Sequence, residues 1–416
     1  MIADIDRLRA ARIMRERGLD AIVLAKPESF RWATGAPPGV AAFFRRAGAA
    51  LALVPADTGL PVSAVCTELF APATRKALGE DQVFTHPDWV ETADIRPWAD
   101  SAENTAQLVT RAHRAAGRQP GFQRPAAYDA TAAFEALKDL LQRERLLKAR
   151  IGLDLDFWPA ADYSFLRARL PQTRWRDASE AVAQIKVIKS ATELDRLSQA
   201  ASLAEAGLQA ALRIIQPGVH RDEIADAWRE GARRAAAERG ARLTGLWEYI
   251  TVGPLPWAGG GAIGSGDILK FDVGCLIDGY SSDSGRTFCL HHASARAHSI
   301  MAALDEAFQC GLGALRPGYL LSDVHARASA AMKRAGFDTF SRGHWGHSLG
   351  HDTFCEVAPF IAAQAHWPIE AGMVLAFETP AYVDGEGGFI IEDQFIITEQ
   401  GPVAAWSAPR PLQTLT

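Results

Sequence analysis

The chain has 416 residues, of which 48% are apolar and 22% charged, and its formal net charge is -5. This length exceeds one ordinary hydrophobic core and predicts two domains, which we place at residues 1–170 and 178–416. The acidic balance, with a pI near 6.1, argues against a nucleic-acid-binding surface. No apolar run in the sequence has the length of a membrane span.

The cysteines and the first residues bear on location. Cys66, Cys275, Cys289, Cys310 and Cys355 include no Cys-x-x-Cys pair. The first residues lack the basic start and apolar core of a signal peptide. We therefore expect reduced thiols and a cytoplasmic location.

The N-terminal part predicts an α/β domain. Residues 5–17 have the apolar spacing of an amphipathic helix that ends at Gly18. Residues 21–25 and 49–54 are short apolar runs typical of buried strands, and helix and strand patterns alternate to about residue 170. No glycine-rich nucleotide loop follows a strand.

A basic cluster precedes the second of these strands. Phe43-Phe44-Arg45-Arg46 has two interpretations: a solvated turn, or an anion-binding loop that is offered to an active site, including that of a partner subunit. Residues 171–177 are the expected linker. A capping box at 190–193 then begins a long helix.

The segment 266–288 places carboxylates in buried strands. Its apolar run contains Asp272, whose burial is costly unless a cation or a hydrogen-bond donor compensates it. The Asp-Gly pair at 278–279 predicts a hairpin turn, and Asp283 follows on the returning strand. We expect this turn to bring Asp272 and Asp283 side by side.

The same pattern recurs further along the chain. The segment that ends at Glu378 matches the one that ends at Asp272 in its glycine, apolar run and final acid, and Glu392 corresponds to Asp283. Two Pro-Gly pairs, each between alanine-rich helical stretches, repeat with it. The C-terminal part is therefore predicted to be an internal duplication. Four converging carboxylates would repel one another, and metal ions are the usual compensation.

Three histidines, His344, His347 and His351, lie in one glycine-rich stretch. Imidazole is the commonest nitrogen ligand of protein-bound metals, so a histidine beside four carboxylates favours ligation. His344 and His351 have three interpretations: as groups that orient the metal ligands, as acid or base groups, or as structural side chains.

These motifs resemble the pita-bread metallohydrolases, the family of aminopeptidase P, prolidase, methionine aminopeptidase and creatinase. The most specific motif is Asp272-x-Gly-x-x-x-x-Gly-Tyr-x-x-Asp283-x-x-Arg286-Thr-Phe, accompanied by Gly-His347-Ser-Leu-Gly. The resemblance implies an α+β fold, with an N-terminal creatinase-like α/β domain followed by a C-terminal pita-bread domain with internal pseudo-two-fold duplication. It also implies a set of metal ligands: Asp272, Asp283, His347, Glu378 and Glu392.

A reaction follows from the same resemblance. Two divalent ions, manganese first and cobalt, iron or zinc as other candidates, would share a bridging water and make hydroxide available near neutral pH. Glu378 would take the proton of this water and pass it toward the leaving nitrogen, with His351 or His344 as candidates for its delivery. The expected reaction is hydrolysis of an amide or peptide C–N bond in a small or dipeptide-like substrate, similar to that of Xaa-Pro aminopeptidase or prolidase.

The sequence departs from the family pattern at groups that bind and protonate peptides. The loop before the first aspartate strand offers Leu255-Pro256-Trp257 where the peptidases carry a histidine, and Phe354 and Cys355 stand where they carry His-Glu. Ile390 replaces an arginine often found two residues before the last glutamate. Trp257 and Phe354 thereby become candidate substrate contacts.

Two alternatives to a peptidase stay open. One is a specialised member that acts on a small carboxylate, as a creatinase-like or cyclic-amidine hydrolase or a metal-assisted lyase. Creatinase holds its substrate carboxylate with a Phe-x-Arg, which Phe43-Phe44-Arg45 resembles, and an arginine that acts in the neighbouring subunit would require a homodimer. The other is a non-catalytic binding module, a class that usually loses ligands, whereas this chain has all five. We expect a homodimer, a small-molecule or dipeptide substrate, and neither nucleic acid nor membrane as a partner.

Overall fold

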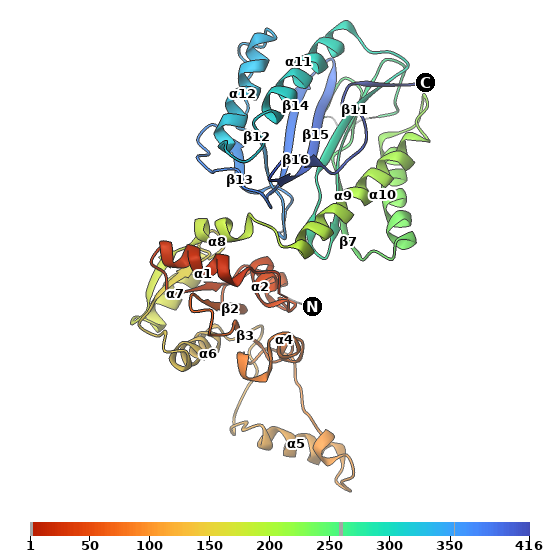
Figure 1. Cartoon of the computed structure of the whole chain (residues 1–416). Helices are drawn as coiled ribbons and strands as arrows, with labels where there is room; N and C mark the ends of the chain where they lie inside the picture. Colours follow the sequence, from red (N-terminus) through yellow and green to blue (C-terminus); the bar gives the residue numbers. More distant parts are fainter. Residues whose placement is uncertain (1–2, 258–260, 353) are drawn as a thin grey trace. The chain divides into compact units, whose positions relative to one another are not determined.

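Two β-sheets organise the chain in the computed structural model, which describes residues 3–257, 261–352 and 354–416 (Figure 1). Among these residues, a six-stranded sheet belongs to a first unit, residues 1–182, and an eleven-stranded sheet to a second unit, residues 183–416. The first sheet packs against one main hydrophobic core and the second sheet against two. The described helices include none with the length and apolar character to cross a membrane.

The sheet of the first unit is mixed, because β1 pairs antiparallel with β2 and parallel with β5. In sheet order its strands are β4 (Val83–His86), β3 (Ser63–Thr67), β2 (Ala50–Pro55), β1 (Ala21–Leu24), β5 (Arg150–Leu153) and β6 (Arg174–Asp177). The helices are α1 (Arg7–Glu16), α2 (Pro27–Thr34), α3 (Ala41–Phe44), α4 (Ala71–Leu78), α5 (Thr105–Ala115), α6 (Ala130–Arg143) and α7 (Ala160–Arg169), followed by α8 (Ser179–Lys186) where the units join. The expected first helix and first two strands are confirmed as α1, β1 and β2.

The central strands of the second unit's sheet follow the order β10-β9-β11-β15-β14-β12-β13. They are β10 (Tyr280–Ser281), β9 (Ile268–Ile277), β11 (Ser284–Leu290), β15 (Gly387–Thr398), β14 (Val374–Val383), β12 (His344–Ser348) and β13 (Val357–Ala362). Four further strands pair with this path: β7 (Leu243–Glu248) and β8 (Thr251–Val252) with β9, β16 (Gly401–Ala404) with β15, and β17 (Gln413–Leu415) with β11.

Two helix pairs cover the sheet of the second unit, as the duplicated sequence predicts. Helices α9 (Ala191–Leu212) and α10 (Arg221–Glu238) share a core with alternate residues of β9, whereas α11 (Ala295–Leu312) and α12 (Leu321–Arg334) share one with alternate residues of β14 and β15. The predicted capping box is present, since Ser190 and Glu193 bond each other's backbone N–H groups. The predicted turn is also present, with Asp278 at φ 50° and Gly279 at φ 86°.

Because side chains alternate along a strand, residues next to the buried ones point to the opposite face. On β9, Leu269, Phe271 and Val273 belong to the core beneath α9 and α10. Lys270 and Asp272 therefore point to the other face of the sheet. That face carries the candidate site.

Candidate metal centre

A row of residues crosses four adjacent strands and carries three of the predicted acids. Asp272 on β9 lies opposite Gly285 on β11. Gly285 in turn lies opposite Glu392 on β15, and Glu392 lies opposite Glu378 on β14. Residues directly opposite one another share a face of the sheet, so the row gathers acids from both copies of the duplicated sequence.

The glycine in this row is required by close packing. A Cβ atom on Gly285 would lie 2.8 Å from the Ile390 side chain and 2.9 Å from the Phe271 carbonyl oxygen. A methyl group does not fit at these distances without a shift of the neighbouring strands.

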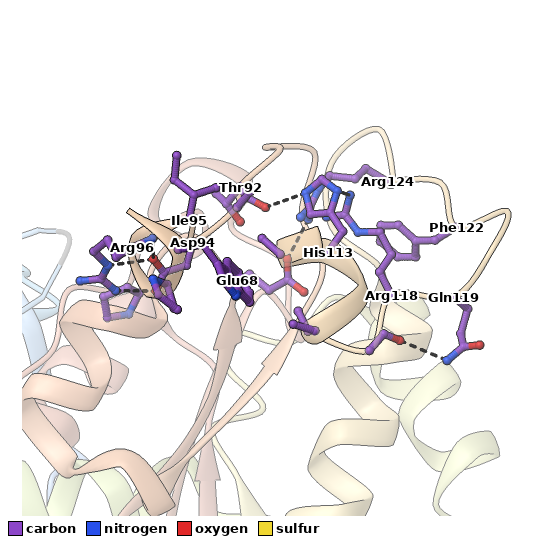
Figure 2. A pocket seen from close by; sticks show the side chains of 18 of the residues that line it. Glu68, Thr92, Asp94, Ile95, Arg96, His113, Arg118, Gln119, Phe122 and Arg124 are labelled. Carbon is purple, nitrogen blue, oxygen red and sulfur yellow. Dashed lines mark hydrogen bonds and ion pairs between the residues drawn. The ribbon is translucent and has the colours of Figure 1, made fainter. Parts of the chain in front are cut away.

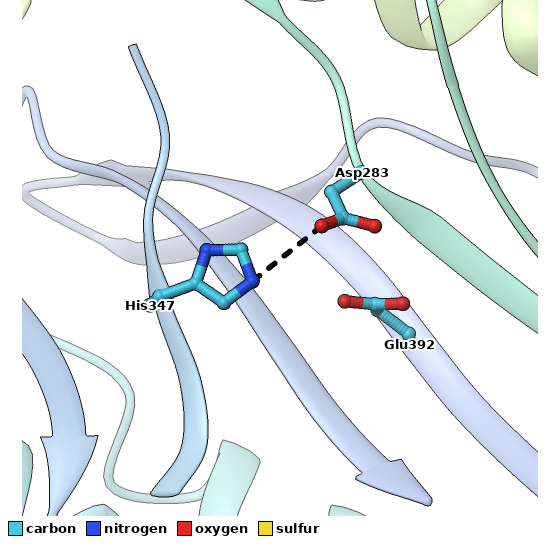
Figure 3. Close-up of side chains that lie close together, drawn as sticks. All are labelled: Asp283, His347 and Glu392. Atoms are coloured by element: carbon cyan, nitrogen blue, oxygen red, sulfur yellow. Dashed lines mark ion pairs between the residues drawn. The ribbon is translucent and has the colours of Figure 1, made fainter. Parts of the chain in front are cut away.

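Asp283 and His347 reach the row from its two sides. Asp283 directly precedes β11, two residues before Gly285, and His347 on β12 lies opposite Ala376, two residues before Glu378. Spacing by two places both on the face of the row. The Oδ2 atom of Asp283 lies 3.4 Å from Nε2 of His347 (Figure 3).

Asp283, His347 and Glu392 form a cluster that fits a divalent cation. One candidate ligand atom from each lies within 4.8 Å of those of the other two. All three side chains are buried, and Oδ1 of Asp283 and Oε2 of Glu392 accept no hydrogen bond from any described residue. Buried carboxylate oxygens without donors are costly, and two carboxylates with one imidazole suit manganese, iron, cobalt or zinc.

The acidities in this cluster also indicate a place for positive charge. Burial raises the pKa of Asp283 to about 7; Asp272 adds to the rise and His347 opposes it. Burial, reinforced by Asp283, raises the pKa of Glu392 well above its ordinary value. Burial by itself lowers the pKa of His347, but the Asp283 carboxylate raises it overall. A bound cation would favour the ionised carboxylates and the neutral ring.

The other two predicted ligands each pair with a cation of this chain. Nζ of Lys270 lies 3.0 Å from Oδ2 of Asp272, and Nη2 of Arg342 lies 2.6 Å from Oε1 of Glu378. The structure thus gathers three of the five predicted ligands into one cluster and places Asp272 and Glu378 in ion pairs. Neither cation was predicted from the sequence. Lys270 had a signal, because it lies two residues before Asp272 on the same strand, whereas Arg342 precedes β12 in a loop with no periodicity.

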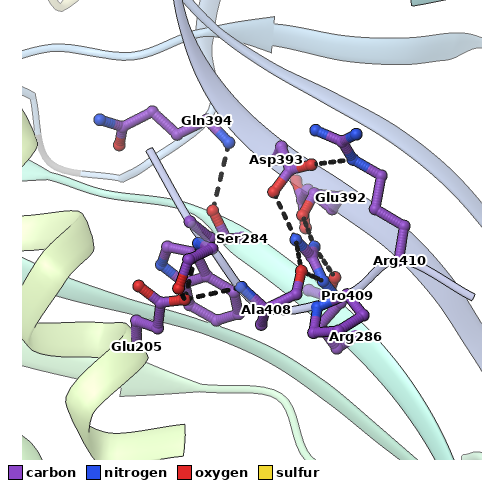
Figure 4. Close-up of polar contacts among 12 residues, drawn as sticks. Glu205, Ser284, Arg286, Glu392, Asp393, Gln394, Ala408, Pro409 and Arg410 are labelled. Atoms are coloured by element: carbon purple, nitrogen blue, oxygen red, sulfur yellow. Dashed lines mark hydrogen bonds and ion pairs between the residues drawn. The ribbon is translucent and has the colours of Figure 1, made fainter. Parts of the chain in front are cut away.

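Arg286, the arginine of the sequence motif, binds the strand that carries Glu392 (Figure 4). Arg286 is buried and donates from Nη1 to the Glu392 carbonyl oxygen at 2.6 Å and from Nη2 to Oδ1 of Asp393 at 2.7 Å. Arg410 binds the other oxygen of Asp393, with Nε at 2.5 Å from Oδ2. These bonds fix the backbone that carries Glu392, so Arg286 has a positioning role.

The two candidate acid or base histidines lie in different surroundings. Nδ1 of His344 lies 3.6 Å from Oε1 of Glu378 and accepts the Gly346 N–H, so the ring proton is on Nε2. Burial lowers the pKa of His344, which keeps the ring neutral near pH 7. The ring of His351 packs against Tyr280, with centroids 5.2 Å apart, beside the turn that joins β9 to β10.

The predicted substrate contacts of the second unit are exposed. Trp257 is 62% exposed and packs on Tyr382, whose hydroxyl lies 3.3 Å from Nζ of Lys270. Phe354 is 60% exposed. The adjacent Cys355 is buried, and burial together with Asp283 raises the pKa of its thiol.

The basic cluster of the first unit lies at the end of α3. Phe43 is 82% exposed. Arg45 pairs with Glu28 at 3.0 Å and lies 5.5 Å from the centre of the Phe157 ring, and Arg46 pairs with Asp162. A role of Phe43 and Arg45 in substrate binding stays a prediction.

A pocket of the first unit is also rich in cations (Figure 2). Arg96 pairs with Asp94 at 2.7 Å, and Arg124 pairs with Glu68 at 2.9 Å. Arg118 pairs with a further acid, Glu91, at 2.7 Å. Arg75 and His113, the other basic side chains of the lining, lie 3.0 Å from Glu80 and Glu91 respectively, so the pocket gives no indication of an anionic ligand.

Comparison with known proteins gives results for both units. Residues 195–399 match Metallopeptidase family M24, and residues 5–188 match the Creatinase/Prolidase N-terminal domain. A putative dipeptidase of Bacillus subtilis (strain 168) is 27% identical over 280 residues, which are 67% of this chain and 77% of that protein. A Xaa-Pro dipeptidase of Lactobacillus delbrueckii subsp. lactis is 24% identical over 247 residues, 58% of this chain and 66% of that one. The solved Xaa-Pro dipeptidase from Bacillus anthracis has the same fold, with a TM-score of 0.73 at 19% identity over 99% of this chain and 100% of the other.

Proposed function

This chain belongs to metallopeptidase family M24 and has a creatinase/prolidase N-terminal domain, and on this basis we propose that it is a metal-dependent hydrolase. The bond that it cleaves is an amide or peptide C–N bond in a small or dipeptide-like substrate. One observation carries the proposal: the buried cluster of Asp283, His347 and Glu392, with two carboxylate oxygens that no described donor satisfies.

Each side chain of the centre has a role in this proposal. Asp283, His347 and Glu392 hold the metal, for which manganese is the first candidate. When bound, a divalent ion supplies Lewis acidity and lowers the pKa of a neighbouring water toward neutrality. Glu378 accepts the proton of that water, and the ion pair with Arg342 orients this carboxylate.

We assign delivery of the proton to the leaving nitrogen to His344 in preference to His351. His344 lies 3.6 Å from Glu378, and its Nε2 carries a proton that it can donate, because Nδ1 accepts the Gly346 N–H. The described ring contact of His351 is instead with Tyr280 at the hairpin turn. His344→Gln should therefore lower turnover more than His351→Gln.

Similarity to Xaa-Pro dipeptidases makes Xaa-Pro dipeptides the first substrates to test. The test uses protein stripped of metal and reloaded with manganese, cobalt, iron or zinc. The panel contains Xaa-Pro dipeptides, acylated amino acids, creatine-like guanidines and cyclic amidines. We expect metal-dependent release of proline or of another small amine from the wild type and none from His347→Ala.

The outcomes separate the proposals. Turnover of small carboxylates alone would favour the specialised alternative and direct attention to Arg45 and to a homodimer. Metal binding without turnover of any panel member would contradict the hydrolase and favour the binding module.

A further inference from the structure

We infer that the centre holds one divalent ion per chain, because Lys270, paired with Asp272, provides positive charge where a second ion would bind. This inference rests on the proposed function, since it concerns the metal on which that function depends. It goes beyond that function by fixing the number of ions and by assigning a role to a lysine.

Lys270 is held firmly beside Asp272. Its side chain is 0% exposed, and Nζ lies 3.0 Å from Oδ2 of Asp272. Two aromatic rings enclose the ammonium group, with Nζ 4.2 Å from the centre of Tyr249 and 5.2 Å from that of Tyr382. The Tyr382 hydroxyl, 3.3 Å from Nζ, completes its surroundings. A buried ammonium is costly unless a carboxylate and other polar partners compensate it, and Asp272 is the carboxylate that does so.

The charges of the site balance with one ion. The facing strands and their ends carry four carboxylates: Asp272, Asp283, Glu378 and Glu392. Lys270 and Arg342 contribute two positive charges through their ion pairs. One divalent ion neutralises the two negative charges that remain. Two divalent ions would leave an excess of two positive charges next to the fully buried Lys270 ammonium, which is unfavourable.

The positions of the ligands also indicate a single divalent ion. Asp283, His347 and Glu392 converge within 4.8 Å, and this is the metal-binding group found among the described residues. A second ion bound to Asp272 would share a carboxylate with the Lys270 ammonium and repel it at short range. Lys270 is thus a positioning residue, which holds Asp272 in place of a metal.

Metal counting tests the inference directly. The full chain is stripped with a chelator, reloaded with excess Mn²⁺ and dialysed, and the bound manganese is counted by inductively coupled plasma mass spectrometry. Electron paramagnetic resonance of the same samples distinguishes isolated Mn²⁺ from an exchange-coupled pair. We expect one ion per chain and an isolated-ion spectrum for the wild type.

Two variants of Lys270 sharpen the test. Lys270→Met removes the charge but retains most of the side-chain volume, and it should raise the count from one to two and produce the coupled spectrum. Lys270→Arg keeps the charge and should stay at one. Circular dichroism and thermal unfolding establish whether each variant folds. If Lys270→Met does not fold, the metal count of the wild type still tests the number of ions.

Each outcome has a separate meaning. Two ions in the wild type would overturn the inference and leave the proposed function intact. One ion in both the wild type and a folded Lys270→Met would overturn the role of Lys270. No bound ion with manganese, cobalt, iron or zinc would overturn the proposed function itself.

Discussion

The two strand pairs of the second unit neutralise their acids in different ways. In the pair of β9 and β11, Asp272 takes its counter-charge from Lys270, two residues away on its own strand. In the pair of β14 and β15, the position two residues before Glu378 is Ala376, and Glu378 pairs with Arg342 from outside the strand pair. The duplicated strands thus retain the positions of the acids but not the source of the opposing charge.

The acids are also arranged differently in the two pairs. Glu378 and Glu392 lie directly opposite each other, whereas Asp272 lies opposite Gly285 and Asp283 lies two residues before that glycine. The proposed ion binds one acid of each pair, Asp283 from the first and Glu392 from the second. The repetition of an acid pair within one chain therefore does not by itself define how many ions the acids hold.

The strongest effect is expected when either carboxylate of the proposed metal cluster, Asp283 or Glu392, is removed. Asp283→Asn and Glu392→Gln should each lower metal affinity by at least about 100-fold, since loss of partners outside the ligand shell already costs about 10–100-fold. Isothermal titration with Mn²⁺ measures this affinity. Glu238→Gln, at an exposed acid that ends α10, is the matched control and should bind like the wild type. Normal binding by only one of the two ligand variants would show that the pairs do not contribute equally.

A smaller loss of activity is expected when Arg342, the cation that pairs with Glu378, is replaced. Arg342→Met should lower kcat by about 10–100-fold, because Glu378 loses the partner that orients it. The number of bound ions should stay at one, because the Arg342 side chain is 24% exposed and solvent can compensate its loss, whereas Lys270 is fully buried. Steady-state kinetics and metal analysis of one preparation give both values. A rise to two ions would mean that the two cations act alike.

The smallest effect concerns the glycine between the strand pairs. Gly285→Ala should lower the free energy of unfolding by about 1–3 kcal/mol, because the added methyl group overlaps Ile390 and the Phe271 carbonyl. Chemical denaturation measures the loss. Gly313→Ala, whose new Cβ would have its nearest neighbour at 3.5 Å, should change stability by no more than about 0.5 kcal/mol. Equal stability of the two variants would contradict the close packing of the row.

Local patterns in the sequence predicted the strands, the hairpin turn and the duplication. The apolar runs and the Asp-Gly pair at 278–279 predicted buried strands joined by a tight turn, and both residues of the turn have positive φ. These features are readable because they depend on residues close together in the chain. The repeated acids predicted that carboxylates gather in one place. The two-residue spacing of Lys270 and Asp272 also implies that both side chains point to the same face of a strand, although the surrounding apolar residues make this hard to recognise in the sequence.

The partners of the acids, in contrast, depend on how distant strands pair. Glu392 meets Asp283 and His347 through the pairing of β11 with β15 and of β12 with β14, strands that are distant in sequence. Arg342 reaches Glu378 from a loop, and His344 rather than His351 lies beside that acid. Strand order and register depend on packing of the whole unit, so no local pattern specifies these contacts.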